Sequence, residues 1–242
     1  MPIGIIVNSL GIFIGGLLGG TIGARLNDEL KEKLTSIFGL CSFLMGVSNM
    51  MAMKHMPAVV FSVVLGYLIG NAIQLTRWIN AGAELMEKPI SALFPQQNQT
   101  LNRELYLFQL TTIIVLFCAS GTGIYGSLES GMTGDHSLLI SKTILDFFTA
   151  MIFAANLGPI VSLISIPQFI IFIALFFAGG NILSVTTPDM IANFKAVGGL
   201  LILATGFNIL EIKRFPVADM IPAMVVSLPL SYIWIHWISP FL

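Results

Sequence analysis

The sequence predicts an all-α fold, a polytopic bundle of about eight helices that cross a lipid bilayer. Only 10% of the 242 residues are charged, whereas 56% are hydrophobic. Soluble domains have about 25% charged residues, so this chain has too little polar surface to face water on all sides. The charges that remain separate long uncharged runs and gather between them.

The uncharged runs divide into segments of the length that a membrane helix needs, about 20 mostly apolar residues. The longest run, 147–188, is too long for one helix and divides near Pro159 and Pro167. Two further segments are expected to span although they contain charged residues. The eight expected spans are 3–24, 34–53, 56–76, 105–126, 136–157, 161–185, 190–210 and 218–239. Together they form a single membrane domain, 1–242.

The Lys and Arg residues indicate the orientation of the chain, because they concentrate in cytoplasmic loops. Eight of them lie in alternate connections, and the opposite connections hold only Lys54 and Lys195. The eight are Arg25, Lys31, Lys33, Arg77, Lys88, Arg103, Lys213 and Arg214. Both termini are therefore expected outside the cytoplasm. No basic segment precedes the first apolar run, so we interpret that run as a membrane helix and not as a signal peptide.

One connection is long, the polar segment 77–104 with Pro89 and Pro95 as helix breakers. We interpret it as a solvated cytoplasmic connector. The alternative is that residues 77–88 form a short amphipathic helix at the membrane surface. Neither interpretation includes a soluble domain.

Two parts of the chain resemble each other. The matching positions are Gly15-Gly16 with Gly179-Gly180, Gly39 and Gly46 with Gly199 and Gly206, and Pro57-Ala58 with Pro222-Ala223. We therefore expect a 3+2+3 layout, in which repeat one (about 3–76) and repeat two (about 161–239) flank the middle helices (about 105–157). Units with an odd number of spans, separated by two more, insert in opposite orientations. Such inverted repeats are common in transporters; chance similarity among Gly-rich apolar helices is the alternative.

A lysine and an aspartate interrupt the fifth expected span. Lys142 and Asp146 are four residues apart and share one helix face, and each charge costs about 2.5–3.5 kcal/mol near the centre of an isolated span. Asp146 lies about 15 Å from the helix start and is too short to reach water. We expect Asp146 to bind a proton or cation during transport, with Lys142 as its counter-charge. Lys142 is close enough to the outer interface to extend toward it, and a purely structural pair is the alternative.

A glycine-rich run, 118–134, precedes this span. Dense glycines destabilise a helix interior, and non-helical backbone at membrane depth needs protein or a watery cavity around it. We expect the fourth span to break here toward Asp146; the alternative is a helix end followed by an external loop. Glu129, Asp135 and His136 are expected at the outer mouth. The candidates for lining a central site are Asn49, Asn208, Ser48, Ser120, Gly121, Thr122 and Gly123.

The sequence lacks the signatures of an enzyme, a nucleic-acid-binding protein or a metal protein. It contains no HExxH, P-loop or GxSxG motif, and a net charge of −1 gives no basic surface for nucleic acid. Cys41 and Cys118 lie in apolar runs and are interpreted as small buried residues. The Met-rich segment 50–56 has ligands that suit Cu(I), but contacts at a helix end are the favoured interpretation. No cofactor is expected.

Four segments carry a resemblance to a known family. They are MPIGIIVNSLGIFIGGLLGG (1–20), GSLESGMTGDHSLLISKTILDFF (126–148), GGLLILATGFNIL (198–210) and FPVADMIPA (215–223). Across nearly its whole length the chain resembles the YqgA/YdfK-like family of bacterial inner-membrane proteins, a family of unknown function. The resemblance implies a multi-pass protein of the bacterial cytoplasmic membrane. Members are usually labelled as transport proteins without an established substrate.

We therefore expect a small secondary transporter of an unknown small solute or ion. Its expected partners are the lipid bilayer, the solute and further copies of the chain. The alternatives are a passive channel, which needs no proton coupling, and a membrane scaffold or assembly protein without transport activity.

Overall fold

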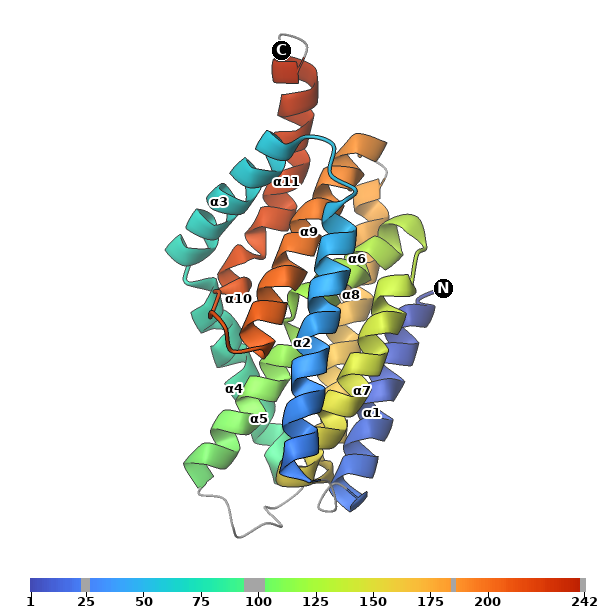
Figure 1. The fold of residues 1–242 in the computed structure, drawn as a ribbon, viewed down its shortest axis with the longest axis vertical. Helices are drawn as coiled ribbons and strands as arrows, with labels where there is room; N and C mark the ends of the chain where they lie inside the picture. Colours follow the sequence, from blue (N-terminus) through green and yellow to red (C-terminus); the bar gives the residue numbers. More distant parts are fainter. Residues whose placement is uncertain (23–26, 94–102, 184–185, 240–242) are drawn as a thin grey trace.

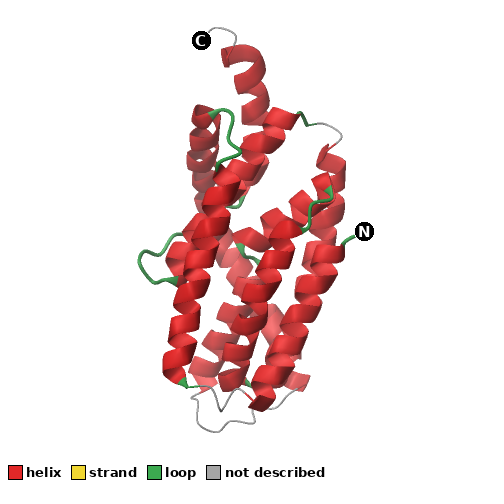
Figure 2. Ribbon diagram, turned by 45° about the vertical axis from the view of Figure 1, so that its right-hand side comes forward, coloured by secondary structure: helices red, strands yellow, loops and turns green. Residues whose placement is uncertain are grey.

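The computed structural model describes residues 1–22, 27–93, 103–183 and 186–239. Every element of this described part is helical, and it contains no strand (Figures 1 and 2). The elements are α1 (Ile3–Ile22), α2 (Asp28–Met50), α3 (Met56–Ala72), α4 (Leu75–Leu93), α5 (Arg103–Cys118), α6 (Gly121–Thr133), α7 (Ser137–Leu157), the 3-10 helix η2 (Pro159–Ile164), α8 (Ser165–Leu183), α9 (Pro188–Ile209), α10 (Val217–Met220), α11 (Pro222–Ile233) and the π-helical turn η3 (Trp234–Ile238). The predicted all-α fold is confirmed.

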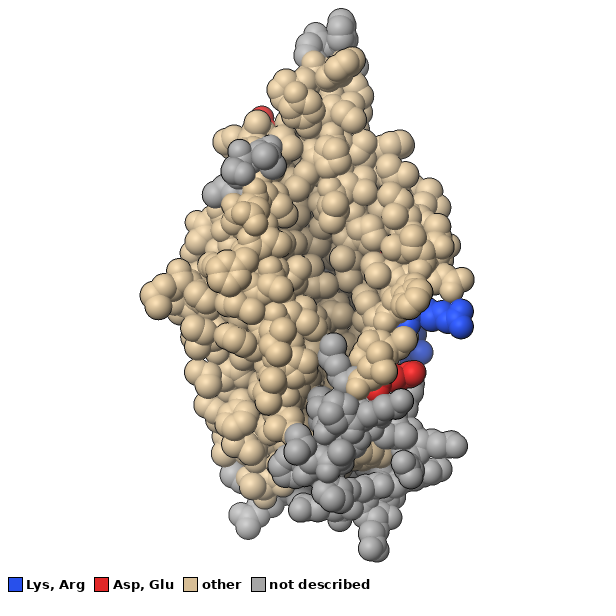
Figure 3. Space-filling view, turned by 180° about the vertical axis from the view of Figure 1, so that it is seen from behind, with Lys and Arg blue, Asp and Glu red and all other residues tan. Residues whose placement is uncertain are grey.

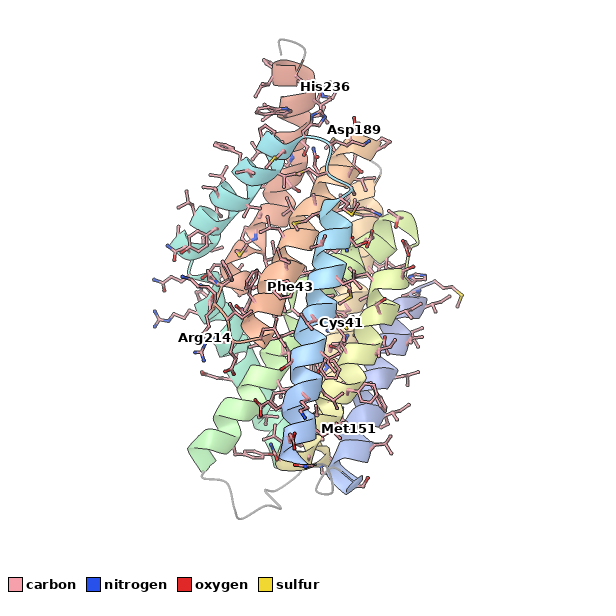
Figure 4. The ribbon with its side chains drawn as sticks, viewed as in Figure 1. Cys41, Phe43, Met151, Asp189, Arg214 and His236 are labelled. Carbon is pink, nitrogen blue, oxygen red and sulfur yellow. The ribbon has the colours of Figure 1, made fainter. Side chains whose placement is uncertain are left out.

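The helices form an elongated bundle, in which α1, α2, α7 and α9 run along the long axis (Figure 1). In Figure 1, α3 and α11 pack together toward the upper end, and α4 and α5 lie toward the lower end. Asp189 and His236 mark the upper end of the molecule, and Met151 lies near the lower end (Figure 4). Arg25 and residues 94–102 of the expected connector lie outside the described residues.

Six helical segments of the described residues are long and apolar enough to cross a membrane. A seventh is added when α3 and the first part of α4, which are bent by 61° at a short break, count as one span. Two physical reasons keep the number below the predicted eight. Helix α3 has only 17 residues, and α2 begins in the charged sequence 28–33, which lowers its mean hydropathy.

The outside of the bundle is apolar, as a lipid-facing surface requires. One face of α1 exposes Leu10, Phe13 and Ile14 to between 40% and 51% of their full area. Figure 3 shows a face of the molecule with few charged side chains: most of those visible gather at its right-hand edge, and an acidic one lies near the upper end. Soluble monomers rarely expose apolar patches of this size. The fold is therefore that of a helical membrane protein.

Two helix contacts hold the bundle together through glycine. On α1, a methyl group added to Gly15 or Gly19 would overlap the main-chain carbonyl oxygens of Phe147 and Met151 on α7. These two helices therefore touch backbone to backbone, the contact that small residues at regular spacing allow in membrane proteins. We call this contact the α1–α7 seam.

Helices α2 and α9 cross at the glycines that match between the two halves of the sequence. A methyl group on Gly46 would lie 2.8 Å from the carbonyl oxygen of Gly199, and one on Gly206 would lie 3.1 Å from that of Gly39. The two helices run antiparallel, because the start of α2 meets the end of α9. Between the glycine contacts, the rings of Phe43 and Phe207 meet edge to face, with centroids 4.7 Å apart (Phe43 is labelled in Figure 4).

The first part of the expected connector 77–104 is a helix, α4 (Leu75–Leu93). Helix α3 ends at Ala72, and Gln74 takes up the left-handed conformation (φ 53°) that redirects the chain. The carboxylate of Asp219 accepts a hydrogen bond from the Thr76 amide (2.8 Å) in the first turn of α4. A negative group at this position stabilises a helix start. Residues 77–88 are therefore helical, as in the alternative interpretation given above.

Candidate functional site

Helix α7 carries Lys142 and Asp146 on its buried face. The buried positions of this helix recur every three or four residues and include Leu139, Lys142, Asp146, Ala150 and Ala154. Lys142 is 4% exposed and Asp146 is 6% exposed. The Lys142 ammonium donates hydrogen bonds to both carboxylate oxygens of Asp146, at 2.6 and 2.5 Å. The four-residue spacing predicted that the two side chains share one helix face, and this prediction is confirmed.

Lys142 was expected to be close enough to the outer interface to extend toward it, but its side chain is buried inside the bundle. Its ammonium lies 6.0 Å from the ring centroid of Phe117 on α5 and bonds to the carboxylate four residues further along its own helix. A partner within reach stabilises the buried ammonium, and the aromatic ring attracts it as well. The lysine is therefore held inside the bundle.

Asp146 also belongs to a chain of buried hydrogen bonds across three helices. Its second oxygen accepts from the amide of Asn8 on α1 (2.8 Å). The side-chain amide of Gln168 on α8 donates to the oxygen of Asn8 (2.7 Å), and the hydroxyl of Ser9 donates to Gln168 (2.5 Å). Sequence analysis missed Ser9 and Gln168, although a lone glutamine in an apolar run signals a polar contact between helices.

A cavity of about 500 Å³ lies against the ion pair, between α2, α5, α7, α9 and the loop that follows α9. Its volume falls within the range of about 300–1,000 Å³ that is typical of small-molecule sites. Besides Lys142 and Asp146, hydroxyl and amide groups line it: Ser42, Thr76, Ser120, Thr122, Thr149, Thr205 and Asn208. Most of the remaining wall is aliphatic or aromatic. We call this space the central cavity.

The chain breaks between α5 and α6 at the wall of the central cavity, as predicted. Ala119 and Ser120 are not helical, and both line the cavity. The Ser120 hydroxyl accepts a hydrogen bond from the Gly123 amide (3.2 Å) and so caps the start of α6. The glycine-rich run beyond the break is helical because its glycines pack closely, with Gly131 against a carbonyl of α8. The external loop of the alternative interpretation is reduced to 134–136.

The predicted lining residues fall into two groups. Ser120, Thr122 and Asn208 line the central cavity together with the ion pair, and Gly121 begins α6 between the first two. The other three lie elsewhere: Ser48 is exposed, Asn49 accepts a hydrogen bond from the Tyr125 hydroxyl (3.3 Å), and Gly123 packs against the ring of Phe172. The Gly-Asn pattern on α2 therefore did not identify the wall, and Ser42, about two turns before Asn49, is the polar residue of α2 that lines it.

Asn208 holds the loop at the mouth of the central cavity. Its side-chain oxygen accepts from the Phe215 amide (2.7 Å), and its amide donates to the Phe215 carbonyl (2.9 Å). Phe215, Pro216 and Glu211 of this loop line the cavity. Arg214, in the same loop, lies at the side of the bundle (Figure 4).

A second ion pair joins α6 to α9. The Lys195 ammonium lies 2.6 Å from a carboxylate oxygen of Glu129, whose side chain is only 6% exposed. Glu129, which was expected at the outer mouth, is buried against α9, where Gly198 lets the ring of Tyr125 on α6 pack closely against that helix. Because 66 positions separate the two residues in the sequence, no local pattern could have revealed the pair.

Asp135 is exposed in the short loop between α6 and α7. The Ser137 amide donates to the Asp135 carboxylate at 2.9 Å. This bond and one from the Ser137 hydroxyl hold the pKa of Asp135 below its usual range, because both stabilise the charged form.

Within the described residues, no group of three or more His, Cys, Asp or Glu side chains is arranged to hold a metal ion. Both cysteines are free thiols; Cys118 is buried and Cys41 is partly buried.

A family model described as "Protein of unknown function (DUF554)" matches residues 3–232. The chain belongs to this family. The "Uncharacterized protein YqgA" of Escherichia coli (strain K12) is 45% identical over 239 residues, which cover 99% of this chain and 100% of that protein. The "Uncharacterized membrane protein YdfK" of Bacillus subtilis (strain 168) is 26% identical over 239 residues, 96% of each chain. No solved structure matches. The resemblance inferred from the sequence motifs is confirmed, and the second name agrees with a membrane protein.

Proposed function

We propose that this chain is a small secondary transporter in which Asp146 exchanges a proton or cation during transport and Lys142 is its counter-charge. The observation that carries the proposal is a buried ion pair that faces a cavity of about 500 Å³ within an apolar bundle. Ionisable groups inside membrane proteins usually mark a substrate or ion pathway. A pair that only fastened helices together would need no open space beside it.

Eight spans and an inner-membrane location are part of this proposal. The uncharged part of α2, residues 34–50, packs along α9 and would supply a further span. With the bent pair of α3 and α4 as one span, the total becomes eight. The alternating distribution of Lys and Arg then favours termini outside the cytoplasm.

An inverted repeat is the architecture that we propose for these spans. A two-fold axis that exchanges Gly39 with Gly199 also exchanges Gly46 with Gly206, and it turns one glycine contact of the α2–α9 crossing into the other. This symmetry supports the repeat. In many transporters the solute binds near the midplane, at the interface between such repeats.

The packing of α1 and α8 gives a second indication of the same axis. Gly15 of α1 lies against the main chain of α7, and Gly179, its counterpart on α8, lies against the main chain of α6. The two middle spans would thus each pack on one repeat, as the 3+2+3 layout requires.

The alternative function is that of a membrane scaffold, and one observation favours it. The hydrogen bonds from Lys142 through Asp146 and Asn8 to Gln168 fasten α1, α7 and α8 together. In a scaffold this network would serve stability alone, and the central cavity would have no role.

The test is proton and charge movement in proteoliposomes that contain the purified chain. Pools of inorganic ions, amino acids and organic acids are supplied under a pH gradient. We expect a flux that depends on one pool and is lost in Asp146→Asn and in the double variant Lys142→Gln/Asp146→Asn, which leaves no unpaired charge. The matched control is Glu29→Gln, because Glu29 forms an exposed ion pair with Lys33 at the same four-residue spacing. Wild-type flux in a folded Asp146→Asn protein would point to a passive channel, and the absence of flux from every pool in the wild type would point to the scaffold.

A further inference from the structure

The central cavity contains a single source of positive charge from side chains. Of the Lys and Arg residues described, Lys142 alone lines it. An ammonium has three donors, and the two bonds of Lys142 described above both go to Asp146. The positive charge is therefore balanced by this one carboxylate.

The other titratable groups near the pair are few. Helices α1, η2 and α8 contain none. Cys118 of α5 interacts electrostatically with both members of the pair. Cys41 is the one titratable side chain in residues 34–50 of α2, and Glu211 lines the cavity but is exposed. On α6, Glu129 is paired with Lys195, and the Tyr125 hydroxyl bonds to Asn49. None of these groups is a second cation that could replace Lys142, and Glu211, the one further carboxylate among the described residues of the wall, is exposed to solvent.

Protonation of Asp146 therefore changes what the cavity attracts. When the carboxylate takes up a proton, the ammonium of Lys142 keeps its charge but loses its counter-charge while it stays buried. An unpaired buried charge is strongly unfavourable, so an anion that enters the cavity is stabilised beside Lys142. By reciprocity, an anion bound at Lys142 favours the protonated form of Asp146 to the same extent.

The break before α6 adds hydrogen-bond donors to the same place. Ser120 and Thr122 line the cavity, and the amides of Gly121 and Thr122 lie in the first turn, where helical N–H groups have no partner within the helix. The start of a helix attracts anions through these groups and through its dipole. Interrupted helices supply anion sites in this way in other transporters.

The rest of the wall selects the body of the anion. Phe38, Phe153 and Phe215 line the cavity together with Leu145 and Ile152. An apolar wall of this kind favours a solute with a carbon skeleton over a strongly hydrated inorganic ion. With one cation available, a second carboxylate on the solute would be left without a partner.

Together these features deepen the proposed function, on which the following statement rests. We infer that the solute is a small organic acid with one carboxylate, which binds at Lys142 together with one proton that goes to Asp146. The charge inside the cavity is then the same before and after loading: one ammonium and one carboxylate. The transported pair carries no net charge.

The experiment measures binding by the full-length protein in detergent, with lactate as the probe. Lactamide is the neutral control of the same shape, and succinate is the control with two carboxylates. We expect lactate to bind about tenfold or more tightly at mildly acidic pH than at mildly alkaline pH. Lactamide and succinate should bind weakly at both.

Two variants separate the roles of the pair. Asp146→Asn imitates the protonated carboxyl, so it should bind lactate with the tighter affinity at both pH values. Lys142→Gln should lose lactate binding; it is expected to fold, because its buried carboxyl can become neutral by taking up a proton. Equal lactate affinity at the two pH values, or binding retained in Lys142→Gln, would overturn the inference. If lactate fails to bind while the liposome assay finds an Asp146-dependent flux of another solute, the inference is wrong and the proposed transporter stands.

Discussion

Removing one member of the Lys142–Asp146 pair should cost far more stability than removing both. Asp146→Asn leaves an ammonium buried without a counter-charge, and breaking a buried pair in this way costs about 3–5 kcal/mol. Lys142→Met leaves a buried carboxyl that has lost its ammonium and must take up a proton, which also costs stability at neutral pH. The double variant Lys142→Met/Asp146→Asn contains no charge at these two positions, so we expect its free energy of unfolding to lie within about 1 kcal/mol of the wild type. Each single variant should therefore lose about 2–3 kcal/mol or more of unfolding free energy relative to the double variant.

The assay is reversible unfolding of the purified protein in mixed micelles with increasing SDS, followed by tryptophan fluorescence. The exposed pair of Glu29 and Lys33 provides the matched cycle, with the same four-residue spacing and a 2.6 Å contact, but with side chains 66% and 69% exposed. Exposed helix pairs contribute about 0.3–0.5 kcal/mol. A coupling energy for the buried pair as small as that of the exposed pair would refute the argument that each charge depends on the other.

Three further predictions concern other parts of the molecule. Gly19→Ala should lower the unfolding free energy by about 1–3 kcal/mol because a methyl group overlaps α7, whereas Gly82→Ala, with open space around it, should not; equal effects would contradict the seam. Asn208→Ala should remove the two hydrogen bonds to Phe215 and free the loop that follows α9. Trypsin should then cleave faster after Lys213 and Arg214; an unchanged cleavage rate would contradict this role of Asn208. Asp135→Ala should cost about 0.5–1 kcal/mol at neutral pH. Since the folded pKa of Asp135 is lowered, that difference is present above the ordinary carboxyl pKa and should vanish as pH falls through the lowered value; a difference that persists in acid would exclude the hydrogen-bonded carboxylate as its cause.

The sequence contained enough to identify the ion pair. An aspartate in an apolar segment is conspicuous because it is costly there, and the four-residue spacing fixes which neighbour shares its helix face. The same local reasoning predicted a break within the run 118–134, where the structure has it at Ala119 and Ser120, since glycine density is a property of neighbouring residues. Features that depend on one helix alone were therefore within reach.

Contacts between distant segments were not within reach. Gln168 meets Asn8 across 160 positions, and Lys195 meets Glu129 across 66. Which face of a helix turns inward depends on the packing of its neighbours, and no local pattern records it. For the same reason Ser42, and not Ser48, lines the cavity: both lie on α2, but α9 and α7 decide which of them is buried.

The α1–α7 seam has a mechanical consequence. At Gly15 and Gly19 the glycine meets main chain directly, with no side chain in between that could change rotamer and absorb a displacement, so sliding at these two positions would bring atoms into overlap. Asn8 and Asp146 sit on the two sides of this seam and keep their 2.8 Å hydrogen bond only if the helices travel as one piece. In any opening of the central cavity, α1 and α7 should therefore move together as one rigid unit. The parts of the structure that can change shape are the break at Ser120 and the loop held by Asn208, which form another part of the cavity wall.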